Sequence, residues 1–236
     1  MSELILVRHG QASFGKASYD KLSEKGIEQV KILSRHWQEL GEQFDHVYSG
    51  TLLRQKETAK ELLPLVKGAP TASIENPAFN EYNGDPLMRV YLRDHAAGDG
   101  FDVPFSWPIQ DERLFQSVFE ASCAKWIRGE LLPGSEDADF EYWENFQHRV
   151  HAAVDEIMAR HSGGSRVLIS TSGGVIAMVL QRVLQFPDQE VITTNWMVHN
   201  SSVSRVKYGQ GKISLTQFNS LTHLERSGFQ DMITYR

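Results

Sequence analysis

The amino-acid sequence predicts an α/β fold of three layers, in which helices flank a mostly parallel sheet. Short, continuously apolar runs are typical of strands buried on both faces, and here they alternate with segments of helical periodicity. This alternation favours parallel strands joined by helices. We expect strands at 4–7, 46–49 and 166–170, helices at 23–41, 51–66 and 175–184, and an antiparallel edge hairpin formed by 203–208 and 213–218.

Local signals support each element. The run 4–7 is entirely apolar. Ser23 is a suitable N-cap for the first helix, whose apolar residues recur at helical spacing before Gly41, a typical helix end. Pro64 should bend or end the second helix. The third helix opens at two glycines after a strand, and the residues 209–211 supply the turn of the hairpin.

The stretch 83–140 does not follow this alternation of strands and helices, because proline, glycine and aromatic residues interrupt short helical patterns. We therefore expect a single domain, 1–236, that carries a mainly helical insertion at about 83–140. The insertion holds 11 acidic and 5 basic residues, a net charge of −6 that equals the charge of the whole chain. The favoured interpretation is a satellite core with a solvated acidic face. The alternative is a lid over a site at the carboxyl edge of the sheet, where open α/β sheets bind ligands.

Composition limits the classes of function. The chain has 24 Lys and Arg against 30 Asp and Glu, which argues against binding to nucleic acid or to an anionic membrane. Its one cysteine, Cys123, excludes an internal disulfide and a cysteine metal site. The first apolar run has acidic and arginine flanks, unlike a secretory leader, and no run reaches the roughly 20 apolar residues of a membrane span. We expect a cytoplasmic protein without metal or cofactor.

Arg8, His9 and Gly10 follow the first expected strand, which delivers them to the carboxyl edge of the sheet. A guanidinium binds two phosphate oxygens at once, and a neutral imidazole can attack phosphorus to form a phosphohistidine. A glycine lets the backbone turn sharply beside a ligand. Taken alone, the tripeptide is more often a surface feature.

Arg54 follows the second expected strand in the same way and falls in the first turn of the helix 51–66. Free backbone N–H groups and the helix dipole already favour an anion there. The alternative is an exposed arginine that pairs with Glu57 or Thr58.

These segments, in this order, resemble the histidine phosphatase superfamily, the family of cofactor-dependent phosphoglycerate mutases and related phosphatases. Several spaced motifs are far more specific than any one of them. The resemblance implies a phosphoglycerate mutase-like fold and metal-independent phosphomonoester chemistry on a small phosphorylated substrate. It covers nearly the whole chain, through the segments 8–10, 19–29, 49–59, 79–81, 146–150, 168–180 and 200–202.

The resemblance also implies roles for single residues. His9 would be the nucleophile that takes the phosphoryl group, and Arg8 and Arg54 would bind its oxygens. Glu81 would protonate the leaving oxygen and later activate water, as a partly desolvated carboxyl can do near neutral pH. Further phosphate or substrate contacts are expected at Gly10, Gln11, Ser13, Ser172 and Gly173.

Ser172 departs from the family pattern, which has a second histidine there that donates to the phosphoryl oxygens. Serine keeps a hydroxyl donor and can cap a helix, but it adds no positive charge. Losing one good transition-state donor typically costs about 10²–10³ in rate. Three outcomes stay open: a slow or specialised phosphatase, a phosphate-binding relative without turnover, or another imidazole in its place, for which His199 beside Asn200 is the first candidate.

The loop 11–15 departs as well. Family members with mutase activity usually carry Thr and Asn in it, whereas this chain has Gln11-Ala12-Ser13-Phe14-Gly15. This difference favours phosphatase over mutase activity. The acidity of 83–140 points the same way, because an acidic lid would disfavour highly anionic substrates such as phosphoglycerate. We expect a monoester with a neutral or apolar leaving group, and we predict no oligomeric state.

A serine hydrolase is the competing prediction. The residues 170–174 differ at one position from a nucleophile elbow between strand and helix, with Ser172 as the nucleophile. Asp188 and either His199 or His223 follow in the chain. This alternative ranks below phosphoryl chemistry because it gives no role to Arg8, His9 and Arg54.

Overall fold

The computed structural model describes residues 1–13, 20–102, 109 and 111–235. It forms two compact units, one of Met1–Glu81 with Arg149–Arg236 and one of Tyr82–His148. The predicted insertion, 83–140, falls within the second unit, apart from 103–108 and 110, which lie outside the described residues. The residues 14–19, with Phe14 and Gly15 of the predicted loop, also lie outside them.

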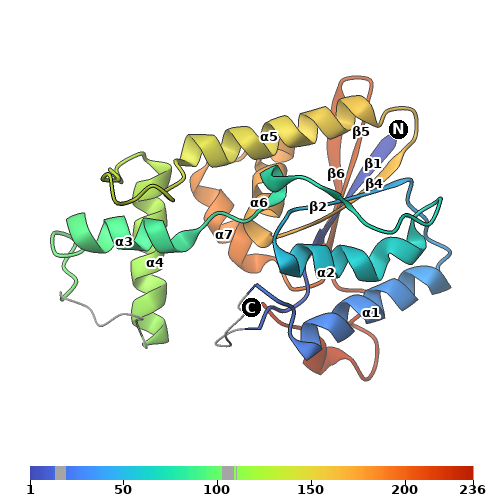
Figure 1. The fold of residues 1–236 in the computed structure, drawn as a ribbon, viewed down its shortest axis with the longest axis horizontal. Coiled ribbons are helices and arrows are strands. Elements are labelled where there is room, and N and C mark those ends of the chain that lie inside the picture. Colours follow the sequence, from blue (N-terminus) through green and yellow to red (C-terminus); the bar gives the residue numbers. More distant parts are fainter. Residues whose placement is uncertain (14–19, 103–108, 110, 236) are drawn as a thin grey trace. The chain divides into compact units, whose positions relative to one another are not determined.

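The first unit is built on a six-stranded sheet of order β3-β2-β4-β1-β5-β6 (Figure 1). β1 to β4 are parallel to one another, and β5 and β6 form the antiparallel edge hairpin. This confirms the predicted α/β fold with a mostly parallel sheet. The strands are β1 (Ser2–Arg8), β2 (His46–Ser49), β3 (Ile74–Glu75), β4 (Arg166–Thr171), β5 (Val203–Gly209) and β6 (Lys212–Ser220).

Local chemistry explains two of the helix boundaries in this unit. Ser23 accepts a hydrogen bond from the Gly26 N–H and so caps the first helix. The helix after β2 changes to a 3₁₀ turn, Leu63–Leu65, at Pro64. The helices are α1 (Glu24–Glu39), α2 (Leu53–Leu62), α6 (Gly173–Leu184) and α7 (Gln189–Met197), together with the end of α5 (Trp143–Arg160).

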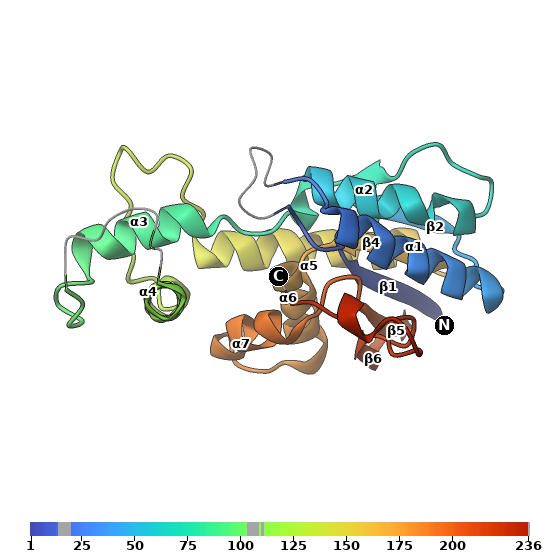
Figure 2. The ribbon, with the colours of Figure 1, turned by 90° about the horizontal axis from the view of Figure 1, so that it is seen from below.

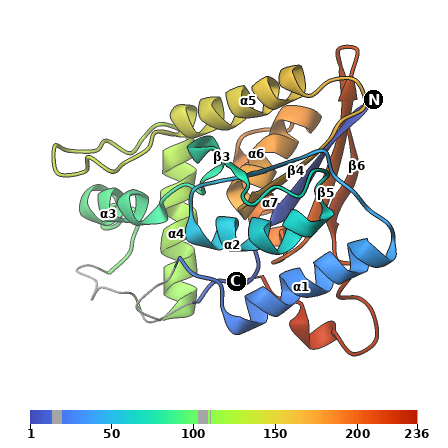
Figure 3. The ribbon, with the colours of Figure 1, turned by 45° about the vertical axis from the view of Figure 1, so that its right-hand side comes forward.

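The core forms because both faces of the central strands are apolar. Ile5 and Val7 of β1 pack with Val30 and Leu33 of α1 and with Leu62 of α2, whereas Leu4 and Leu6 are buried on the other face. Figure 2 and Figure 3 show α1 and α2 on one side of the sheet and α6 on the other. The three layers fix the strand ends from which the candidate site is built.

The register of the parallel strands places three chain segments at one edge of the sheet. Arg8 pairs with Thr171 and Ser49 pairs with Ser170, so β1, β2 and β4 end side by side. His9 and Ser172 are the next residues on their two strands. α2 and α6 begin at this same edge, which brings two helix N-termini to it.

The second unit contains α3 (Gly84–Asp94), α4 (Glu112–Ile127) and the first part of α5. Its centre is Trp126, whose ring lies 4.9 Å from Trp143 and 5.0 Å from Tyr82, and whose Nε1 donates to the Glu141 carbonyl at 2.7 Å. The expected satellite core is therefore aromatic. The described helices of the chain include none that is long and apolar enough to cross a membrane.

Acidic residues of this unit are partly neutralised by ion pairs. Buried Asp137 accepts from Arg89 at 2.9 Å, from Arg93 at 2.8 Å and from the Gly134 N–H at 2.9 Å. These donors hold the pKa of the Asp137 carboxyl well below its ordinary value, with the Arg89 hydrogen bond as the largest cause. Lys125 pairs in turn with Asp99 and Glu130.

Candidate active site

His9 is fixed by its backbone at the end of β1. Its N–H donates to the Thr171 carbonyl at 2.8 Å, and its own carbonyl accepts from the Ser201 N–H and from Asn200 Nδ2, both at 3.3 Å. The residue is only 6% exposed. The chain segments on both sides of β1 thus hold the backbone of His9 in place.

The ring of His9 is held in one neutral tautomer. Its Nδ1 lies 2.7 Å from the Gly10 carbonyl oxygen, which can only accept, so Nδ1 carries the proton and Nε2 carries the lone pair. Burial, then the charges of Arg54 and Arg8, lower the pKa of His9 well below its ordinary value. The imidazole is therefore neutral at neutral pH, which is the form that attacks phosphorus.

Arg54 faces this lone pair from the first turn of α2, as predicted from its position in the sequence. Its Nε donates to His9 Nε2 at 3.1 Å. Its Nη1 pairs with Asp20 at 2.6 Å, and the other Asp20 oxygen accepts from the Leu53 N–H at 2.7 Å. The side chain of Arg54 thus pairs not with Glu57 or Thr58 but with a carboxylate that also receives the first N–H of α2, while Thr58 Oγ1 donates to the Arg54 backbone carbonyl at 2.8 Å.

Arg8 adds a second positive charge near the imidazole. Its Nη1 donates to the carbonyl of Val198, at the end of α7, and its positive charge contributes to the low pKa of His9. His9 therefore lies in the field of two guanidinium groups, which suits a dianionic phosphoryl group.

Close packing against Gly26 explains why a glycine stands at position 10. A Cβ on Gly10 would overlap the Gly26 carbonyl oxygen, and a Cβ on Gly26 would overlap the Gln11 carbonyl oxygen. The two glycines let the loop after β1 lie directly on the start of α1. The Gly10 N–H also donates to Thr58 Oγ1 at 3.2 Å, which ties the loop to α2.

Gln11 and Ser13 take part in this same packing. Gln11 Oε1 accepts from Ser23 Oγ at 3.0 Å, and its N–H donates to Gln29 Oε1 at 2.8 Å. Ser13 Oγ donates to the Leu22 carbonyl at 3.0 Å. These contacts shape the loop between β1 and α1.

Glu81 lies at the N-terminus of α6. Its Oε2 accepts from the Gly174 N–H at 2.9 Å. The segment before it is tied to the edge of the sheet, because Asn80 exchanges hydrogen bonds of 2.7 Å with Thr51 and because the Phe79 carbonyl accepts from Thr171 Oγ1 at 2.7 Å. The acid expected for proton transfer thus reaches the edge that carries His9.

Ser172 occupies the N-cap position of α6 but makes no capping hydrogen bond through its side chain. The prediction that it can cap this helix is corrected here, because Glu81 receives the Gly174 N–H instead. The buried Ser172 Oγ accepts from Gln55 Nε2 at 2.8 Å. Next to it, a Cβ on Gly173 would overlap Asn195 Oδ1, so α7 packs closely on the start of α6.

His199, the candidate for a replacement imidazole, is engaged elsewhere. Its Nδ1 lies 3.0 Å from Asn219 Nδ2 in β6, and its ring is 4.1 Å from that of Tyr235. Asn200 holds the His9 carbonyl and accepts from Thr234 Oγ1 at 2.9 Å. Asn200 therefore supports the site through the backbone of His9.

The residues of the rival serine triad each have other partners. Asp188 accepts from Gln181 at 3.0 Å, and His223 Nε2 lies 2.9 Å from Ser201 Oγ. The hydroxyl of Ser172 is held by an amide rather than by an imidazole. This arrangement gives Ser172 no general base within the contacts that the structure shows.

Three residues at the site received no role from the sequence. Asp20 and Gln55 lie inside the motif segments, so their proximity could have been inferred from the spacing, but not the direction of their side chains. Thr234, near the carboxyl end of the chain, bonds to Asn200 and also accepts from Gln29 Nε2 at 2.9 Å. Nothing in the pattern of its neighbours indicates that contact.

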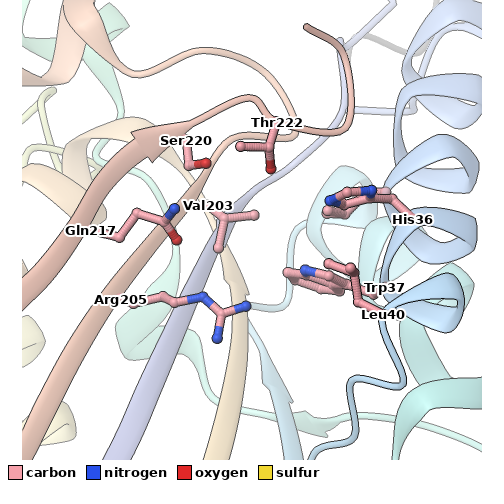
Figure 4. A pocket seen from close by; sticks show the side chains of 9 residues that line it. His36, Trp37, Leu40, Val203, Arg205, Gln217, Ser220 and Thr222 are labelled. Atoms are coloured by element: carbon pink, nitrogen blue, oxygen red, sulfur yellow. The ribbon is translucent and has the colours of Figure 1, made fainter. Parts of the chain in front are cut away.

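A hollow of about 270 Å³ lies between α1 and the β5–β6 hairpin (Figure 4). The rings of His36 and Trp37 face Arg205 and Gln217 across it. Arg205 is paired with Glu3 and Glu42, so its charge is already compensated. Within the described ranges, no three His, Cys, Asp or Glu side chains cluster in a way that could hold a metal ion.

Comparison with known proteins decides the family. The sequence matches the family model of the histidine phosphatase superfamily, branch 1, over residues 4–91 and 115–221. The chain belongs to this superfamily. Members of the superfamily include phosphatases and mutases, and the site at the end of β1 lies within the matched residues.

Similar proteins within the superfamily act on small phosphorylated compounds. The chain is 25% identical to a metal-independent phosphoserine phosphatase of Arabidopsis thaliana, covering 97% of this chain and 86% of that one. It is 24% identical to a 2,3-bisphosphoglycerate-dependent phosphoglycerate mutase of Parvibaculum lavamentivorans, covering 81% of this chain and 84% of that one. A phosphoserine phosphatase of Entamoeba histolytica, solved in complex with 3-phosphoglyceric acid, superposes with a TM-score of 0.61 at 17% identity, covering 95% of this chain and 100% of that one.

Proposed function

We propose that the chain is a phosphomonoester hydrolase that acts through a phosphohistidine on His9. The observation that carries this proposal is the state of the imidazole. It is neutral, its Nδ1 proton is held by the Gly10 carbonyl, and its Nε2 lone pair faces Arg54. A phosphoryl group bound by Arg54 and Arg8 would lie next to that lone pair.

The proposed reaction has two steps. First, Nε2 attacks phosphorus, the bond from phosphorus to the ester oxygen breaks, and the Glu81 carboxyl protonates the departing oxygen. Second, a water molecule gives its proton to Glu81 and attacks phosphorus, the bond from phosphorus to Nε2 breaks, and phosphate is released. We infer that neither step needs a metal ion or another cofactor.

Hydrolysis is favoured over mutase activity by the charges near the site. Asp20, whose side chain is 41% exposed, places a carboxylate on Arg54. This carboxylate disfavours a leaving group that carries its own negative charges, so the proposed substrate is a small monoester with a neutral or apolar leaving group. The single cysteine, which leaves no internal disulfide, supports our proposal of a cytoplasmic enzyme.

A panel of phosphomonoesters tests this proposal, with His9→Ala and Glu81→Gln as the variants. We expect turnover in the native protein, loss below detection in His9→Ala, and a loss of about 10²–10⁴ in kcat in Glu81→Gln. His36→Ala, in the hollow beside α1, is the matched control and should keep native turnover. Phosphate binding without turnover on any ester would instead support the alternative of a non-catalytic relative. Labelling of Ser172 by a covalent serine probe would support the serine hydrolase.

A further inference from the structure

Gln55, the residue after Arg54 in α2, connects this helix to Ser172. Its side chain is fully buried, and its Nε2 donates to the Phe79 carbonyl at 2.9 Å and to Ser172 Oγ at 2.8 Å. Because a carbonyl oxygen only accepts, the contact with Phe79 fixes which end of the amide carries the hydrogens. Both N–H groups of the amide are thereby used.

This contact determines the direction of the Ser172 hydroxyl. Since Ser172 Oγ accepts from Gln55, the hydroxyl proton must point away from the amide. Ser172 makes no capping bond to α6, because the Gly174 N–H is taken by Glu81. Ser172 also stands one residue beyond the Arg8–Thr171 pair, beside His9 on the neighbouring strand. Its O–H is therefore a donor at the edge of the sheet where the phosphoryl group is proposed to bind.

Stability alone does not explain a glutamine at this position. Gln55 Oε1 is buried and accepts no hydrogen bond from the described residues, which is costly for a carbonyl oxygen. The oxygen lies against Gly50, where a Cβ would overlap it, and the Gln55 backbone carbonyl accepts from Ser170 Oγ at 2.8 Å. An apolar side chain would fill the same volume without an unsatisfied oxygen. The amide gives two hydrogen bonds that an apolar side chain would lack, and because the Phe79 carbonyl also accepts from Thr171 Oγ1, the bond to Ser172 is the one with no substitute.

We propose that Gln55 is a positioning residue, which holds the Ser172 hydroxyl so that its proton is donated to a phosphoryl oxygen at His9. The inference rests on the proposed function of His9. It gives Ser172 a defined part in the site, as a neutral hydrogen-bond donor oriented by a buried amide. Gln55 does not touch the substrate in this account and acts only through Ser172.

A double-mutant cycle tests this coupling, with kcat/KM for p-nitrophenyl phosphate as the measured quantity. Ser172→Ala and Gln55→Leu should each lower it about tenfold, the size of one lost hydrogen bond, and the double variant should lose no more than either single variant. Gln43→Leu, an exposed glutamine before β2, is the matched control and should change nothing. Gln55→Met serves as the second substitution if Gln55→Leu does not fold.

Two results would overturn the inference while the proposed function stands. One is a Gln55 variant that is as active as the native protein. The other is a Gln55 substitution that lowers turnover as much in the Ser172→Ala background as in the native one, because Gln55 would then act by another route. If the native protein turns over no ester, the proposed function fails, and the cycle is measured as affinity for inorganic phosphate. Equal, non-additive losses of affinity would then support the inference, and additive losses would overturn it.

Discussion

The proposed chemistry depends on one side chain, the imidazole of His9. Its low pKa has three causes that act in the same direction, first burial and then the charges of Arg54 and Arg8. The hydrogen bond to the Gly10 carbonyl opposes them and fixes the tautomer. Burial alone would give an inert neutral histidine, whereas the tautomer and Arg54 direct its lone pair towards an anion site.

His9 should therefore remain neutral well below pH 6.5. A folded-state pKa below the ordinary value means that the proton is taken up only at lower pH, so the nucleophile stays competent in mildly acidic solution. NMR titration of the His9 ring measures this directly. Arg54→Gln should raise the pKa of His9, because the second-largest cause is removed. A His9 that titrates at or above pH 6.5 in the native protein would contradict the account.

Asp20 is the residue that should set the preference among leaving groups. Its charge lies beside Arg54, and a unit charge about 8 Å from an anionic leaving group is worth about 1 kcal/mol at an intermediate dielectric constant. Asp20→Asn should therefore raise kcat/KM for phosphoglycerate relative to p-nitrophenyl phosphate by roughly fivefold. Asp155→Asn, a surface carboxylate on α5, is the control. An unchanged or reversed ratio would remove Asp20 from this role.

At the scale of the elements, the sequence predicts those with strong local signals. The strands from 46 and 166 and the capped helix from Ser23 begin at the expected residues. The expected elements do not include β3, α5 and α7. β3 has only two residues and α7 has a weak apolar pattern, whereas the helical spacing of Phe146, Val150, Val154 and Ile157 could have indicated α5. The sequence also indicates that His9 and Arg54 share one edge of the sheet. It does not reveal that Asp20 pairs with Arg54, because that contact depends on how the loop after β1 packs against α2.

The loop 199–202 is held in place by a buried pair that sequence patterns do not show. Ser201 has a left-handed backbone, with φ of 57°, and its Oγ lies 2.9 Å from His223 Nε2. Burial, and to a smaller extent the charge of His36, lowers the pKa of His223 to about 3. The pair supports the two groups of this loop that bind the His9 carbonyl.

Acid should therefore destabilise the fold through His223. In the unfolded chain, His223 takes up a proton below its ordinary pKa of 6.5, whereas in the folded protein it does so only near pH 3. The stability that is present above pH 6.5 is therefore lost as the pH falls from 6.5 towards 3. At pH 4 this group alone accounts for about 3 kcal/mol. Urea unfolding at pH 7 and pH 4 should show a smaller acid loss in His223→Gln than in the native protein. The exposed variant His148→Gln should behave as the native protein does, and an equal acid loss in all three proteins would refute this.

At the scale of the whole molecule, the net charge of −6 belongs to the stretch 83–140, while the rest of the chain is balanced. Part of this negative charge is compensated locally, because Asp137 and Glu130 form ion pairs with arginine and lysine side chains within the second unit. The first unit carries the predicted site and a carboxylate of its own beside it, Asp20. Of these carboxylates, Asp20 is the one that the structure places beside the predicted site.

The native protein should accordingly hydrolyse aryl phosphates faster than phosphoglycerates. Steady-state kinetics on both classes, at matched ionic strength, gives the ratio of kcat/KM values. The ratio should fall as salt is added, because screening weakens the repulsion of the more anionic substrate. Faster turnover of phosphoglycerate would contradict the proposed preference without affecting the assignment of His9.

The phosphoenzyme itself provides the most direct test of the central claim. The native protein is incubated with a ³²P-labelled aryl monoester, quenched in base, and analysed for the position and the acid stability of the label. We predict an acid-labile label on His9, which His9→Ala abolishes together with turnover. Turnover that survives in His9→Ala, or an acid-stable label on Ser172, would contradict the account.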